Sequence, residues 1–218
     1  NASYAIKDAD NLYAVSETGN ASGAYSFSLG DETAMTADKR QTGADPCFIM
    51  RYEDWILTAD YSGGSVTVFP LCDGVLGDCI QRLEFQGEGP VEGRQESSHI
   101  HQLKVIPGFE GKWILATDLG ADKIRLLLIT SDEQDVVRYI SDVDCPSGSG
   151  PRHMEFSKDN KTLYCISELS GNVLVYSINM TDIPQFTLIQ EVQADEVNAG
   201  GSADIHLRII SHTSLFCP

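Results

Sequence analysis

The most constraining feature of this sequence is an internal repeat with a period of about fifty residues. Four segments share one pattern, in which an apolar run containing Trp or Tyr ends on a carboxylate. The segments are residues 11–17, 54–60, 112–118 and 162–168; they end on Glu17, Asp60, Asp118 and Glu168, which are 43, 58 and 50 residues apart. Self-similarity at such a period is the signature of repeat architectures. The fold must therefore accommodate about four copies of one supersecondary unit.

Each copy is typical of four antiparallel strands. Strand-like pieces at 47–50, 101–105 and 153–156 precede the shared run, and pieces at 66–69, 124–128 and 173–176 follow it. Gly or Asn stands in the turns between them and supplies the positive φ angles of tight hairpins. A segment such as 187–192 completes the unit. Apolar residues alternate or run continuously, without the 3.6-residue period of a helix, so we expect no helix of useful length.

Four antiparallel strands at this period predict an all-β fold, a β-propeller built of four-stranded blades. The approximate blades are 1–43, 44–97, 98–149 and 150–201, with the start of another blade at 202–218. The first blade is expected to lack its innermost strand. Seven such blades need roughly 350 residues, so 218 residues supply an incomplete arc of about four. A β-sandwich and a closed four-bladed ring are the structural alternatives.

Charge and cysteine content limit the classes of partner and of site that the chain can have. The chain has 15 Lys and Arg against 32 Asp and Glu, a net charge of −17. This argues against nucleic acid and anionic membrane surfaces as partners, because both need a basic face. The cysteines lack the C-x-x-C spacing of zinc or redox motifs, so we expect reduced thiols in strands, with disulfides as the alternative. They are residues 47, 72, 79, 145, 165 and 217.

Propeller geometry brings particular side chains together. The innermost and second strands of a blade form an antiparallel hairpin, so the start of the first lies beside the end of the second. Arg152 and His153 then lie near Glu168, and His99 and His101 lie near Asp118. We expect all these groups on one face of the disc, around the central channel, where a ligand site follows naturally.

Histidines and arginines are the main candidates for chemistry there. His99 and His101, two residues apart in a strand, point to the same side and suit a proton relay, an anion or a metal, although no third metal ligand is suitably spaced. Arg152 offers a cationic fork for phosphate or carboxylate, unless it only pairs with Glu168. His101, His153 and His206 recur at intervals of 52 and 53 residues, which predicts one equivalent position in successive blades.

Four motifs together resemble the seven-bladed propeller lactonase family, whose best-known members are bacterial 6-phosphogluconolactonases. The motifs are residues 59–66 (ADYSGGSV), 93–101 (GRQESSHIH), 150–153 (GPRH) and 167–169 (SEL). The resemblance runs in order from about residue 11 to 206 and implies a cytoplasmic enzyme without a cofactor, acting in the pentose phosphate pathway. It departs at about residue 207, where the usual turn and strand are replaced. The chain thus resembles a partial copy.

The resemblance also implies catalytic residues in the central pocket: His99, His101, Arg152 and Glu168. Arg94, His153, Asp118, Asp204 and His206 are expected to bind substrate. Of these, Asp204 and His206 match a later family motif less specifically.

The predicted reaction is hydrolysis of a sugar lactone, 6-phosphogluconolactone in the first place. Water attacks the carbonyl, Glu168 or a histidine removes its proton, and Arg152 with Arg94 holds the anionic substrate. Because the whole chain repels anions, such a substrate requires a local cationic cluster. The alternatives are a lactonizing or lyase-type enzyme acting on a muconate-like dicarboxylate, and a non-catalytic binding propeller. We expect a monomer or weak oligomer.

Overall fold

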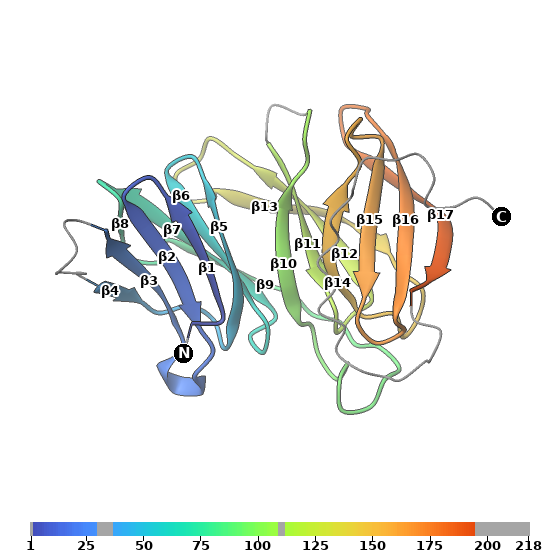
Figure 1. Cartoon of the computed structure of the whole chain (residues 1–218), viewed down its shortest axis with the longest axis horizontal. Coiled ribbons are helices and arrows are strands. Elements are labelled where there is room, and N and C mark those ends of the chain that lie inside the picture. Colours follow the sequence, from blue (N-terminus) through green and yellow to red (C-terminus); the bar gives the residue numbers. More distant parts are fainter. Residues whose placement is uncertain (1, 30–36, 109–111, 195–218) are drawn as a thin grey trace.

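The computed structural model describes residues 2–29, 37–108 and 112–194 of the chain, and in them β-strands form four separate antiparallel sheets. Figure 1 shows the sheets side by side in chain order, from the blue N-terminal sheet to the orange C-terminal sheet. The prediction of an all-β propeller arc is confirmed. A β-sandwich, with two sheets face to face, is excluded by this arrangement. The described residues contain no helix long and apolar enough to cross a membrane.

The first sheet, blade 1, has the order β1 (Tyr4–Asp8), β2 (Asn11–Ser16), β3 (Gly23–Ser28) and β4 (Ala37–Arg40), with a short 3-10 helix at Gly19–Ala21. The expectation that this blade lacks its innermost strand is wrong. β1 occupies that place, pairs with β2 from Tyr4↔Val15 to Asp8↔Asn11, and packs beside β5 of the next sheet. Its five residues alternate between half-buried and exposed, a pattern too short to stand out in the sequence.

The second sheet, blade 2, contains β5 (Pro46–Tyr52), β6 (Trp55–Asp60), β7 (Ser65–Cys72), β8 (Val75–Leu76) and β9 (Gln81–Glu84). Its outermost position is shared, because β9 pairs with the start of β7 and β8 with its end. Blade 3 contains β10 (Ile100–Val105), β11 (Trp113–Asp118), β12 (Lys123–Ile129) and β13 (Val137–Asp144). Blade 4 contains β14 (Pro151–Phe156), β15 (Thr162–Ser167), β16 (Asn172–Asn179) and β17 (Gln185–Gln193).

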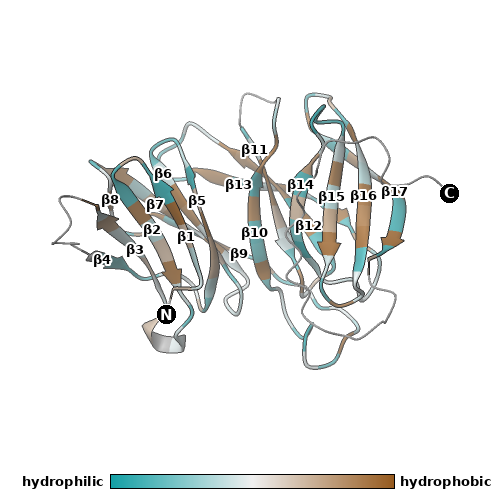
Figure 2. Ribbon diagram, viewed as in Figure 1, coloured by the Kyte–Doolittle hydropathy of each residue, from teal (hydrophilic) through white to brown (hydrophobic). Residues whose placement is uncertain are grey.

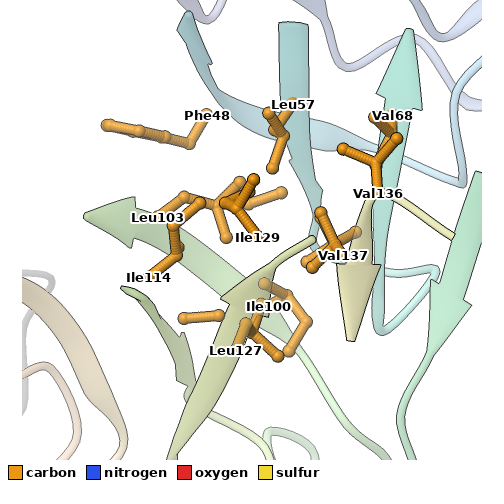
Figure 3. Close-up of a cluster of buried hydrophobic side chains, with 13 residues drawn as sticks. Phe48, Leu57, Val68, Ile100, Leu103, Ile114, Leu127, Ile129, Val136 and Val137 are labelled. Carbon is orange, nitrogen blue, oxygen red and sulfur yellow. The ribbon is translucent and has the colours of Figure 1, made fainter. Parts of the chain in front are cut away.

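The hydrophobic cores lie between the sheets. One joins blades 1 and 2, a second joins blades 2 and 3, and a third joins blades 3 and 4. Figure 3 shows the second, in which Phe48, Leu57 and Val68 of blade 2 meet Leu103, Ile114 and Leu127 of blade 3. A middle blade thus buries both faces, which is why β11 is buried along its whole length and begins with the apolar run Trp113–Ala116.

The outer edge of blade 4 has the opposite character. β17 is mostly exposed, and Figure 2 shows hydrophilic residues in its middle and the hydrophobic colour mainly on inner strands. The innermost strands β1, β5, β10 and β14 lie next to one another in chain order. Their N-terminal ends therefore gather on one face of the arc, where the site is built.

Candidate functional site

A β-bulge stands at the start of the innermost strand in three of the four blades. In blade 2 the pairing jumps from Pro46↔Asp60 to Phe48↔Ala59, so Cys47 is the extra residue. The same jump makes His101 the extra residue in blade 3 and Arg152 the extra residue in blade 4. A bulge bends the strand and re-aims one side chain. Cys47, His101 and Arg152 occupy equivalent positions, and all three line one cavity.

The bulges correct the predicted equivalence of the histidines. His101 is equivalent to Arg152, whereas His153 pairs with Ile166 just as Gln102 pairs with Thr117. The prediction that His101 and His153 occupy one repeated position is therefore wrong by one residue. His206 lies outside the described residues. The two histidines nevertheless meet, with ring centroids 5.1 Å apart and planes nearly perpendicular.

The carboxylates that end the repeated runs occupy two different places. Asp60 and Asp118 are the last residues of β6 and β11, and the residue in that register is Ser167 in blade 4. Glu168 follows its strand by one residue, and Glu17 follows the end of β2 in the same way. That single residue decides their surroundings. Both aspartates are fully buried, whereas both glutamates line the cavity.

Asp60 and Asp118 form buried hydrogen bonds and ion pairs within their own blades. Asp60 accepts hydrogen bonds from the Thr58, Ser65 and Thr67 hydroxyls and from the Gly43 N–H, at 2.6–3.0 Å. Burial raises the pKa of Asp60 above its ordinary value of 3.8, although these hydrogen bonds oppose the shift.

Asp118 forms an ion pair with Arg125, whose side chain is only 7% exposed. It also accepts a hydrogen bond from the His99 N–H at 2.8 Å. The structure therefore does not bring Asp118 to the cavity.

The centre of the site is an ion triad formed by Arg94, Glu168 and Arg152. Arg152 Nε lies 2.9 Å from Glu168 Oε2, and a terminal nitrogen of Arg94 pairs with Glu168 Oε1. The glutamate side chain is 9% exposed, that of Arg152 17% and that of Arg94 42%. Hydrogen bonds to Glu168 and Tyr61 raise the pKa of Arg94. Each carboxylate oxygen of Glu168 thus holds one guanidinium group.

Aromatic rings form the second half of the site. The Tyr61 ring stacks in parallel on His99 at 4.4 Å and meets His101 edge-on at 5.8 Å. His99 Nδ1 donates to the Tyr61 carbonyl oxygen at 3.0 Å. His101 then contacts His153 as described above. His99 supports Tyr61 from behind, and His101 and His153 face the cavity.

The cavity measures about 460 Å³ and receives residues from all four blades. Of the predicted site residues the structure brings together Arg94, His101, Arg152, His153 and Glu168; His99 and Asp118 do not line the cavity, and Asp204 and His206 lie outside the described residues. Five further lining residues were not predicted. They are Ser3, Tyr4, Glu17, Cys47 and Tyr61. Glu17, Cys47 and Tyr61 stand inside segments quoted in the sequence analysis, but only the structure reveals that they line the cavity.

Among the described residues, no group of three or more His, Cys, Asp or Glu side chains is arranged so that it could hold a metal ion. The five cysteines of those residues are free thiols. Burial, with the charges of Glu17 and Asp60, raises the pKa of the Cys47 thiol, so this thiol is protonated at neutral pH. Two guanidinium groups, imidazoles and carboxylates are the chemically useful groups present.

Comparisons with known proteins agree on one family. A family model described as "Lactonase, 7-bladed beta-propeller" matches residues 1–211, past the point where the resemblance was expected to end. The chain is 30% identical to the 6-phosphogluconolactonase of Bacillus subtilis over 95% of its own length and 60% of the relative's.

Solved structures give the same result. A putative 6-phosphogluconolactonase from Bacteroides uniformis superposes with a TM-score of 0.84 at 38% identity, covering 95% of this chain and 61% of that one. One from Bacteroides fragilis superposes with a TM-score of 0.80 at 35% identity, covering 92% and 59%. The chain spans about 60% of the length of the relatives it matches.

Proposed function

Since the chain belongs to the seven-bladed β-propeller lactonase family, we propose that the protein containing it hydrolyses a sugar lactone at the cavity that holds the Arg94–Glu168–Arg152 triad. The observation that carries this proposal is the position of the triad. Two arginines paired with one glutamate line the same cavity of about 460 Å³ as the imidazoles of His101 and His153. Such a site offers anion recognition beside groups able to accept a proton.

The arginines supply the cationic cluster that the acidic chain otherwise lacks. Arg94 is 42% exposed and contacts Glu168 through one terminal nitrogen, so part of its guanidinium remains directed to solvent. An anionic group of the substrate binds there. The lactone carbonyl oxygen lies against Arg152, where a guanidinium stabilises the negative charge that develops during attack.

His101 is the proposed general base. Glu168 uses both oxygens to hold arginines, which makes it a positioning group, and His99 is stacked behind Tyr61. Water attacks the carbonyl carbon as His101 accepts its proton. The ring C–O bond then breaks, the departing oxygen takes the proton from His101, and a hydroxy acid is released.

The substrate within this class is proposed to be 6-phosphogluconolactone, which gives 6-phosphogluconate for the pentose phosphate pathway. The names of the relatives support this choice. A muconate-like dicarboxylate would also suit two arginines, so it serves as the competing ligand below. A cytoplasmic location and a monomeric or weakly associating state stay predictions.

The test is steady-state kinetics on the full-length protein that contains these residues, with 6-phosphogluconolactone and the unphosphorylated lactone. Removing one transition-state donor lowers kcat by about 10²–10³-fold, so we expect Arg152→Ala to lose about that much. The matched control is Arg138→Ala, because Arg138 pairs with Asp135 on the exposed surface. Equal turnover of wild type and Arg152→Ala would refute the role of Arg152. Absence of hydrolysis, or tighter binding of a dicarboxylate than of phosphogluconate, would refute the reaction or the substrate.

A further inference from the structure

We propose that Asp122, which lies outside the cavity, is a positioning residue that sets both arginines of the triad on Glu168. Asp122 stands in the turn between β11 and β12, is 6% exposed, and accepts hydrogen bonds from two loops of different origin. One loop carries Arg94, and the other leads into Arg152. The proposal rests on the proposed function only for its kinetic test.

The first loop connects blades 2 and 3 and reaches Asp122 through Gln95. The Gln95 side chain is 1% exposed, and its Nε2 donates to Asp122 Oδ1 at 2.9 Å and to the Leu119 carbonyl at 2.8 Å. Its Oε1 accepts from the Val91 N–H at 3.2 Å. The backbone of the loop also closes on itself, with the Arg94 N–H donating to the Val91 carbonyl. Arg94 belongs to no strand, so the anchored neighbour Gln95 determines where its backbone lies.

The second loop connects blades 3 and 4 and binds the same carboxylate. Asp122 Oδ1 accepts from the Gly150 N–H at 2.8 Å and from the Ser149 hydroxyl at 3.2 Å, and Oδ2 accepts from the Gly148 N–H at 2.6 Å. The Gly150 carbonyl in turn accepts from the Glu168 N–H at 2.8 Å. Gly150 therefore links Asp122 to Glu168 directly and to Arg152 two residues further along the chain.

An aspartate suits this place for two reasons. A carboxylate accepts hydrogen bonds at both oxygens, and four donors converge here, two of them backbone N–H groups that would otherwise be buried without a partner. The backbone of Asp122 has φ +51°, a left-handed conformation that Asp tolerates better than most residues. All three members of the triad then depend on one side chain, and a shift of either loop separates a guanidinium from Glu168.

The chain offers a matched control in Gln81. Gln81 also joins blades 2 and 3, with Nε2 donating to Asp135 Oδ1 at 3.0 Å and to the Val137 carbonyl at 2.8 Å, and with Oε1 accepting from the Val137 N–H. It binds a rim loop and does not line the cavity. Gln95→Ala and Gln81→Ala therefore remove similar interblade hydrogen bonds, one near the triad and one away from it.

The experiment compares Gln95→Ala, the nearly isosteric Asp122→Asn, and Gln81→Ala in the full-length protein. The main readout is the NMR signal of the Arg152 Nε–H group, because this nitrogen forms an ion pair with Glu168 Oε2 at 2.9 Å. We expect both Gln95→Ala and Asp122→Asn to shift this signal and speed its exchange with water, and Gln81→Ala to leave it unchanged. An unmoved signal in both test variants would overturn the proposal.

Kinetics give the second readout. Because a misplacement of about 1 Å can cost 10²-fold, we expect kcat/KM for the lactone to fall by about 10- to 100-fold in both test variants and to stay near wild type in Gln81→Ala. A purely structural role predicts equal losses of stability in the two glutamine variants with equal kinetics. If the wild type hydrolyses no lactone, the proposed function fails, and the arginine signal still decides whether Asp122 positions the triad.

Discussion

Replacing Asp118 by Asn tests whether this carboxylate stabilises blade 3 through its buried ion pair with Arg125. Asp118 is 0% exposed, and its Oδ2 lies 2.7 and 3.0 Å from two nitrogens of Arg125. Oδ1 accepts from the His99 and Ala121 N–H groups. The substitution leaves the buried guanidinium with Asp142, at 2.8 Å, and the Gln86 carbonyl as partners.

The structure sets the size of the effect. Breaking a buried ion pair by removing one partner costs about 3–5 kcal/mol. Since Asp142 remains beside Arg125, the lower limit applies, and we expect Asp118→Asn to reduce the free energy of unfolding by about 3 kcal/mol. The control is Asp144→Asn on β13 of the same blade, which breaks the pair with Lys123. Asp144 is 82% exposed, so its loss should cost less than about 1 kcal/mol.

The assay is equilibrium urea unfolding of the full-length protein and both variants, followed by circular dichroism. The m-values should agree, so that a shifted midpoint reports stability. A loss for Asp118→Asn no larger than that for Asp144→Asn would refute the buried-pair reasoning. It would also reopen a direct role for Asp118 at the ligand site.

Three further predictions concern the blades. Burial raises the pKa of Asp60 in the folded chain, so the stabilisation from its protonation is complete below about pH 3.8 and is lost as the pH rises through the raised folded pKa. A plot of unfolding free energy against pH should lack this fall for Asp60→Asn. Parallel curves for wild type and variant would contradict the prediction. A Cβ on Gly120 would lie 1.7 Å from the Ser97 carbonyl oxygen, so Gly120→Ala should reduce the free energy of unfolding by about 3 kcal/mol or more. Gly171→Ala should cost about 1 kcal/mol, because nothing lies within 4 Å of a Cβ there. Equal thermal midpoints of the two variants would be inconsistent with this packing. Leu57 is fully buried between blades 2 and 3, whereas Leu188 is 39% exposed on β17. Urea unfolding should therefore show a loss of about 2–5 kcal/mol for Leu57→Ala and of about 0.5 kcal/mol or less for Leu188→Ala.

The blade architecture could be predicted from the sequence because burial between neighbouring sheets leaves a repeated pattern in each strand. Interior strands bury both faces between neighbouring sheets, and this produces continuous apolar runs such as Ile114–Leu115–Ala116 at a regular period. Hairpin turns then follow from Gly and Asn. β1 escaped prediction because it is short and half exposed, so nothing in its pattern distinguishes it from a loop.

The site was predictable in part. The pairing of Arg152 with Glu168 follows from hairpin geometry, since the start of β14 lies beside the end of β15. The exact register did not follow, because a β-bulge adds one residue without a sequence signature. Because of this bulge, His101 occupies the position of Arg152, and His153 occupies the position of Gln102. In the same way, Asp118 and Glu168 look equivalent in the repeat, yet one is buried in the strand and the other lies beyond it.

The most direct test of the account is a crystal structure of the full-length protein with 6-phosphogluconate, the product of the proposed reaction. We predict that its anionic groups contact Arg94 and Arg152, that its carboxylate carbon lies within reach of His101, and that Glu168 keeps at least one guanidinium in place. Product bound away from these arginines, or bound through His99 and Asp118, would contradict the central claim that the bulged residues and the ion triad form the active site.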